Sequence, residues 1–193
     1  MVNYKMYIYG NHAVNEALLQ NPEAVRKVYF ASRMDAGRLR ALVKKHNIPT
    51  AVLTPGKVPE GGHGADVVHQ GVIGVISSQA LIMPYQKFVD ALQVGKDTLL
   101  VVLGEVQDPH NVGAIIRSAA AFGVAGVLIP EHKQAPVTGA VVKVSAGMAF
   151  RVPLVSIGNV NHTIADLKKR GFWTYGLAGE GVNTIEKEKF DEP

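Results

Sequence analysis

The sequence predicts an α/β protein with a small N-terminal α/β domain followed by a larger domain containing a parallel sheet. Its 193 residues are 47% hydrophobic and 19% charged, a composition typical of globular proteins. Short apolar segments alternate with segments of helical period along most of the chain. Pro84 and Gly95 interrupt this alternation. We therefore predict a first domain over residues 1–78, a linker over 79–97 with a short helix at Gln86–Leu92, and a second domain over 98–193.

The first domain combines strand-like and helical segments in turn. Its predicted strands are Met6–Tyr9, Lys27–Ala31, Thr50–Leu53 and Gly71–Ile76, the last of them after a turn at His69-Gln70-Gly71. Asn11 is a candidate N-cap for a helix over His12–Gln20, and a basic helix is expected near Ala36–His46. About 80 residues arranged in this way are enough for a small domain that folds by itself.

The second domain shows a regular alternation of apolar strands and helices. The predicted strands are Thr98–Gly104, Ala125–Ile129, Val152–Ser156 and Phe172–Leu177, and the predicted helices are Pro109–Phe122, Val137–Phe150 and Thr163–Arg170. This order indicates a parallel sheet with helices on both faces. Ligands of such sheets bind beyond the carboxyl ends of the strands, so the loop after Gly104 is the first candidate site.

Basic residues are concentrated in the first half of the chain. The net charge is +4, but residues 1–84 hold nine Lys/Arg against five Asp/Glu, whereas residues 85–193 hold eleven of each. A basic surface favours polyanions through phosphate contacts and counterion release, and a solvated helix face is the alternative. The candidate RNA-binding residues are Arg26, Lys27, Arg33, Arg38, Arg40, Lys44 and Lys45.

Several functional classes are disfavoured by what the sequence lacks. It has no cysteine, which excludes disulfides and thiolate chemistry and favours a cytoplasmic protein. No apolar run approaches the roughly 20 residues that span a bilayer, and the first residues do not have the pattern of a signal peptide, so no membrane association is expected. No H-E-x-x-H pattern suggests a metal site, and no G-x-G-x-x-G follows a strand to suggest an ordinary dinucleotide-binding domain.

The segment LLVVLGEVQDPHNVGAIIRSAAAFGVAGVLIP, Leu99–Pro130, contains the strongest candidate for chemistry. A strand leads into a polar loop that ends at Asp108-Pro109, a capping side chain followed by a proline suited to the first helical position. Gly123 provides a C-terminal stop for the helix.

Arg117 is the only formally charged side chain between Pro109 and Pro130. Its neighbours at helical spacings of three and four are small, so a phosphate or another chain could approach closely; they are Gly113, Ala114, Ala120 and Ala121. An ordinary solvent-facing arginine is the alternative interpretation when this residue is considered alone.

The pattern N-x-G-x-x-x-R-x-x-x-x-F-G is similar to the first motif of the SpoU/TrmH family of RNA ribose 2′-O-methyltransferases. It is formed by Asn111, Gly113, Arg117, Phe122 and Gly123. Further segments resemble the same family, namely Lys143–Pro153 with the sequence KVSAGMAFRVP, the G-x-x-A-V-x-E-A-L segment at Gly10–Leu18, and His69-Gln70-Gly71. Nearly the whole chain is covered by this resemblance.

The resemblance implies transfer of a methyl group from S-adenosylmethionine to a ribose 2′-hydroxyl, in the branch that modifies a guanosine of large-subunit ribosomal RNA. It implies a methyltransferase domain of the trefoil-knot (SPOUT) type, a homodimer, and catalytic roles for Asn111 and Arg117, with Gly113, Phe122 and Gly123 supporting the motif. Because arginine remains protonated in proteins, our hypothesis is that Arg117 holds the target phosphate and stabilises the developing 2′-alkoxide rather than acting as a base.

Two motifs of the family are absent from this sequence, a G-x-E-x-x-G loop after a further strand and an S-L-N segment opening the last helix. In the family these motifs form the knot and most of the methyl-donor pocket. The cofactor-binding residues are therefore unknown, and the main cofactor-binding loops are expected beyond Pro193. The 193 residues are expected to lack the knot-forming segment, to bind S-adenosylmethionine weakly or not at all, and to be inactive by themselves.

Two alternatives to the catalytic hypothesis stay open. A non-catalytic RNA-binding protein that has lost the methyl-donor site is the second hypothesis. An unrelated α/β enzyme using the Glu105–Asn111 loop is the third, supported only by topology.

Overall fold

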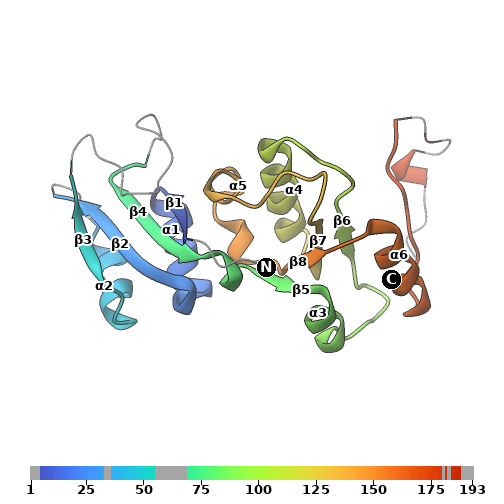
Figure 1. Cartoon of the computed structure of the whole chain (residues 1–193), viewed down its shortest axis with the longest axis horizontal. Helices are drawn as coiled ribbons and strands as arrows, with labels where there is room; N and C mark the ends of the chain where they lie inside the picture. Colours follow the sequence, from blue (N-terminus) through green and yellow to red (C-terminus); the bar gives the residue numbers. More distant parts are fainter. Residues whose placement is uncertain (1–4, 33–35, 55–68, 180, 182–183, 188–193) are drawn as a thin grey trace.

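The computed structural model describes residues 5–32, 36–54, 69–179, 181 and 184–187. Two four-stranded sheets follow one another along the long axis of the molecule, with α5 lying between them (Figure 1). The strands of the first sheet lie within residues 5–77 and those of the second within residues 82–157. No helix in the described residues is both long enough and apolar enough to traverse a bilayer.

The first sheet has the strand order β1-β4-β2-β3. Its strands are β1 (Lys5–Tyr9), β2 (Val25–Ala31), β3 (Thr50–Leu53) and β4 (Val72–Ser77), and its helices are α1 (Asn11–Gln20) and α2 (Gly37–Lys45). The central strand β4 pairs antiparallel with β1 and β2, and β3 pairs parallel with β2. Every residue of β4 is buried, because both faces of the sheet carry apolar side chains.

The second sheet is entirely parallel, as predicted, with the order β5-β8-β7-β6. Its strands are β5 (Ile82–Pro84), β6 (Leu100–Val102), β7 (Gly126–Pro130) and β8 (Leu154–Ile157). Its helices are α3 (Tyr85–Ala91), α4 (Pro109–Ala121), α5 (Gly139–Val144) and α6 (Val160–Lys169). The segment 79–97, expected to be a linker, thus includes an edge strand and a helix of this sheet.

Side chains of β7 show how the helices cover the second sheet. Val127 and Ile129 pack in the cluster that includes residues of α4 and α5, whereas Leu128 packs on the other face with residues of α3 and α6. Neighbouring residues of a strand point to opposite faces, so this alternation fixes the three-layer arrangement. The carboxyl ends of all four strands consequently meet at one edge.

The prediction that Asn11 caps the first helix is wrong. Gly10 occupies the N-cap position with φ +90°, and Asn11 is already helical. The backbone amide of Asn11 donates instead to Oε1 of Gln70 at 3.3 Å. Gln70 belongs to the predicted His69-Gln70-Gly71 turn, where both Gln70 and Gly71 have positive φ. A distant side chain therefore accepts from the first helical amide, at the helix start where a local cap was expected.

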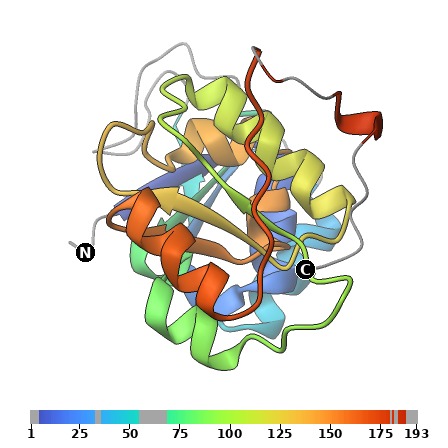
Figure 2. The same cartoon turned by 90° about the vertical axis from the view of Figure 1, so that its right-hand side faces the viewer.

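Two predictions in the second half are also corrected. The helix expected over Val137–Phe150 is divided into α5 and a 3-10 turn, Met148–Phe150, because Ala146 and Gly147 both adopt left-handed backbone conformations. The strand expected at Phe172–Leu177 is absent, since residues 172–178 have no regular structure and run along the outer end of the second domain (Figure 2). Trp173 and Leu177 are exposed there.

Candidate functional site

The loop between β6 and α4 lies at the carboxyl edge of the parallel sheet. Asp108 begins α4 as predicted, because its Oδ1 accepts a hydrogen bond from the His110 backbone amide at 2.8 Å. Pro109 occupies the first helical position, where a missing amide proton is harmless. At the far end, Gly123 has φ +69° just after the C-cap Phe122, so the predicted stop is confirmed.

Gln134, in the loop after β7, holds the β6–α4 loop in place. Its Oε1 accepts from the Val106 backbone amide at 2.9 Å, and its Nε2 donates to the Val106 carbonyl at 2.6 Å. The Ala135 amide also donates to that carbonyl at 3.0 Å. Sequence reasoning missed this contact, because Gln134 lies 28 residues from Val106 and belongs to no local motif.

The helix α4 presents one packed face and one open face. Gly113 is buried against α5, where an added Cβ would lie 2.7 Å from Cβ of Val144. Asn111 in the first turn and Arg117 further along the helix are both exposed. The small residues around Arg117 therefore differ in their surroundings. Gly113 permits close helix packing, whereas Ala114 and Ala121 are exposed and add little bulk beside Arg117.

Arg117 is available for an external anion. Among the ion pairs between described residues, none involves Arg117. A planar guanidinium can bind two phosphate oxygens at once, and low side-chain bulk around it leaves room for a polynucleotide backbone. The arrangement fits the predicted phosphate contact. Asn111, also exposed, has an amide that can both donate and accept hydrogen bonds to ribose hydroxyls.

Two glycines at this edge lie beside open space. A Cβ added at Gly104, after β6, or at Gly158, after β8, would meet no atom within 4 Å. Glu131, after β7, is exposed and accepts a hydrogen bond from the Ser156 hydroxyl at 2.6 Å.

The basic residues of the first domain occupy two elements. Arg26 and Lys27 lie on β2, whereas Arg38, Arg40, Lys44 and Lys45 lie on α2, and Arg33 lies outside the described residues. The guanidinium of Arg40 lies 4.5 Å from the ring centroid of Phe30, and Nζ of Lys27 lies 4.9 Å from that of Tyr29. Phe30 and Tyr29 belong to core clusters on opposite faces of the sheet, so the predicted basic residues are distributed around β2.

Two family profiles match the two halves of the chain. Residues 98–193 match the SpoU rRNA methylase family, and residues 7–81 match the RNA 2′-O ribose methyltransferase substrate-binding domain. The 23S rRNA (guanosine-2′-O-)-methyltransferase RlmB of Vibrio vulnificus is 35% identical over 186 residues, which are 95% of this chain and 74% of that protein. The Haemophilus influenzae protein of the same name is 34% identical over 189 residues, covering 96% and 76%.

Solved structures show the same fold. The SpoU methyltransferase AviRb from Streptomyces viridochromogenes, solved with AdoMet, superposes with a TM-score of 0.66 at 20% identity. A TrmH-family protein from Porphyromonas gingivalis gives a TM-score of 0.61 at 24% identity. Each match covers 86% of this chain, which spans 59% of either solved chain. With two profiles in the expected order and an alignment to RlmB proteins over nearly its whole length, the chain belongs to the SpoU rRNA methylase family.

Proposed function

We propose that this protein takes part in S-adenosylmethionine-dependent methylation of a ribose 2′-hydroxyl in RNA, with a guanosine of large-subunit rRNA as the target. The observation that carries the proposal is the 35% identity over 95% of the chain to a protein named for that reaction. This chain matches the profiles of two domains, the substrate-binding domain and the methylase domain. A ribosomal RNA substrate would place the protein in the cytoplasm.

In this proposal Arg117 acts on the nucleic acid. Its guanidinium binds the phosphate next to the target ribose and stabilises negative charge as it develops on the 2′-oxygen. Asn111, in the first turn of α4, orients the ribose by hydrogen bonding. Gly113 keeps the helix packed on α5, and Phe122 with Gly123 ends it, so these residues support the position of the two catalytic side chains.

The role of Arg117 can be measured on the 193-residue chain through its affinity for 23S rRNA. We expect Arg117→Lys to weaken binding, because lysine keeps the charge but loses bidentate phosphate geometry, and Arg117→Ala to weaken it further. Ser118→Ala, on the same exposed side of α4, is the matched control and leaves the dissociation constant unchanged. Equal affinity of Arg117→Lys and the parent chain would exclude the bidentate contact.

Donor binding separates the catalytic hypothesis from a non-catalytic RNA-binding protein. Neither a G-x-E-x-x-G loop nor an S-L-N segment occurs in residues 1–193, and the carboxyl edge is open beside Gly104 and Gly158. We therefore propose that these residues by themselves bind S-adenosylmethionine weakly or not at all and transfer no methyl group. Calorimetric titration with S-adenosylmethionine tests this directly, and tight binding of the donor would contradict it. RNA binding without donor binding supports the second hypothesis for this chain.

We also propose that the protein forms a homodimer through its methylase domain. Among the described residues, five of the eight large apolar side chains found exposed lie within residues 98–193; they are Leu99, Phe122, Trp173, Tyr175 and Leu177. Phe122 is 83% exposed at the end of α4. Exposed apolar surface of this kind is usual at interfaces. Sedimentation velocity across a concentration series tests the proposal, and Phe122→Ser should shift the equilibrium toward monomer.

A further inference from the structure

The two domains share one continuous hydrophobic core. The largest cluster of buried residues contains Met6, Ala13 and Val14 of the first domain together with Val141 and Ala149 of the second. In the structure α5 and the 3-10 turn Met148–Phe150 lie against β1 and α1 (Figure 1). The sequence predicts a linker between the two domains and gives no indication of this shared core.

Two glycines permit the close approach of the domains. A Cβ added at Gly139, the first residue of α5, would overlap the carbonyl oxygen of Tyr7 on β1. A Cβ at Gly147 would lie 2.9 Å from both Cβ and Cγ of Glu16 on α1. Gly147 also has φ +81°, which other residues rarely adopt. At both positions the backbone of one domain therefore touches the other domain directly.

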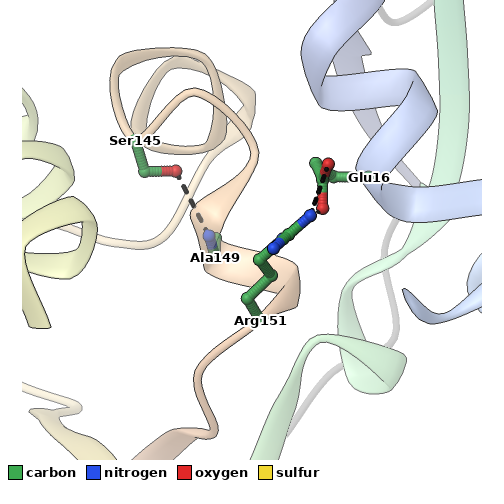
Figure 3. A network of polar contacts seen from close by, with 4 residues as sticks. All are labelled: Glu16, Ser145, Ala149 and Arg151. Carbon is green, nitrogen blue, oxygen red and sulfur yellow. Dashed lines mark hydrogen bonds and ion pairs between the residues drawn. The ribbon is translucent and has the colours of Figure 1, made fainter. Parts of the chain in front are cut away.

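A bidentate ion pair lies at the edge of this interface. Nε of Arg151 donates to Oε2 of Glu16 at 2.6 Å, and Nη2 donates to Oε1 at 3.1 Å (Figure 3). The Glu16 side chain is only 11% exposed, whereas that of Arg151 is 47% exposed. Hydrogen bonding to Glu16 raises the pKa of Arg151 above its ordinary value. Without Arg151, a nearly buried carboxylate would lose its cation and two hydrogen-bond donors.

The segment that precedes Arg151 is joined to α5 by hydrogen bonds of Ser145. Ser145 is completely buried, and its Oγ donates to the Val142 carbonyl at 2.9 Å. The same oxygen accepts from the Ala149 amide at 3.4 Å (Figure 3). These bonds join the end of α5 to the following 3-10 turn, directly before Arg151. The position of the guanidinium is therefore coupled to α5, on which Gly113 of α4 also packs.

We propose that Glu16 and Arg151 are positioning residues that lock the substrate-binding domain onto the methylase domain. The lock sets the separation between the basic residues of α2 and Arg117, so that one RNA must contact both at a fixed spacing. Two sites on a rigid body bind a long ligand with an effective concentration that two freely moving domains do not reach. The functional consequence rests on the proposed RNA substrate, whereas the lock itself does not.

The interdomain distance can be measured by pulsed electron spin resonance. The chain has no cysteine, so Ala41→Cys on α2 and Ala165→Cys on α6 place one spin label in each domain. We expect a single narrow distance distribution for this pair, and its loss when Arg151→Glu is added. The charge exchange Glu16→Arg with Arg151→Glu should restore the narrow distribution, which general destabilisation would not do.

A second label pair is the matched control. Ala121→Cys and Ala165→Cys lie within the second domain, and their distance should be the same in every variant. A broad interdomain distribution in the parent chain, or a narrow one that survives Arg151→Glu, would overturn the proposal. Thermal unfolding of each variant identifies any that fails to fold, and Arg151→Gln then replaces it, since glutamine removes the charge without introducing repulsion.

RNA binding tests the consequence separately. Arg151→Glu should weaken the affinity for intact 23S rRNA by about tenfold or more, well within the 10²- to 10⁴-fold gain typical of linked sites. An oligonucleotide of about ten nucleotides, bound at one site at a time, should show no change. An equal loss of affinity for both RNAs would refute the proposal that the fixed spacing between the two domains contributes to RNA binding. If neither RNA binds the parent chain, the proposed function fails while the distance measurement still decides the lock.

Discussion

Gln134 and Val106 are joined by two hydrogen bonds between a side-chain amide and a peptide unit, at 2.9 and 2.6 Å. The contact fixes the loop from which α4 begins. In Gln134→Leu the Val106 carbonyl keeps the Ala135 amide as a donor, so the loss falls on the Val106 amide.

A fully buried unpaired amide costs about 1–3 kcal/mol, and because Val106 is half-buried we expect the free energy of unfolding of Gln134→Leu to fall by about 1 kcal/mol. Urea unfolding measures it, and hydrogen exchange at Val106 should accelerate. Gln107→Leu, exposed in the same loop, is the control. If Val106 remains protected from exchange in Gln134→Leu, the contact does not hold the loop.

Gly113 allows α4 to pack closely on α5. Alanine there would place its Cβ 2.7 Å from Cβ of Val144 and 3.1 Å from the Val141 carbonyl oxygen. We expect Gly113→Ala to destabilise the fold by about 1–3 kcal/mol, outweighing the gain in helix propensity, because both neighbours must move. Gly104→Ala is the control, since a Cβ there meets open space. Thermal unfolding of the two variants tests the prediction, and equal melting temperatures would contradict it.

Tyr85 links α3 to α6, since its hydroxyl donates to Oδ2 of Asp166 at 2.7 Å and Arg170 Nε binds the same oxygen at 2.7 Å. Burial, followed by the hydrogen bond to Asp166, raises the pKa of Tyr85 from 10.0 to about 12. The folded state therefore favours the neutral phenol. Its contribution to stability is complete below pH 10 and is lost as the pH rises through 12.

The stability difference between the parent chain and Tyr85→Phe should shrink over that pH interval. Urea unfolding at several pH values measures this difference. Phenolate absorbance should also show one tyrosine titrating near pH 12 in the parent and not in the variant. A difference in stability that stays constant up to pH 12 would contradict the assignment.

Lys44 and Lys45 end α2 as exposed cations. If they contact phosphates, replacing both by alanine should weaken RNA binding and lower the slope of log affinity against log salt by about 0.7 for each lost contact with a single strand. Lys168→Ala with Lys169→Ala removes the same charge from α6 and is the matched control. An identical slope in the parent and the Lys44/Lys45 variant would exclude these lysines from the RNA interface.

Local signals were sufficient to predict the segment that carries the candidate site. Asp108 and Pro109 begin α4, and Gly123 ends it, because a capping oxygen, a preset φ and a left-handed glycine act within a few residues of one another. The same holds for β3, which spans Thr50–Leu53 as predicted. The parallel order of the second sheet followed from alternating strands and helices.

Long-range contacts decided the rest. The segment Phe172–Leu177 has strong strand propensity, but a strand exists only where a neighbour supplies hydrogen bonds, and no described strand pairs with it. Conversely, Ile82–Pro84 is short and contains proline, yet it forms β5 because β8 lies beside it in register.

The sequence by itself determined the family motif, the α/β class and the helix that presents Asn111 and Arg117. Only the tertiary structure decided how the two domains sit together. Glu16 and Arg151 are 135 residues apart, and their meeting depends on backbone approach at Gly139 and Gly147. No local sequence pattern predicts such contacts, because they form only when elements far apart in the sequence pack against one another.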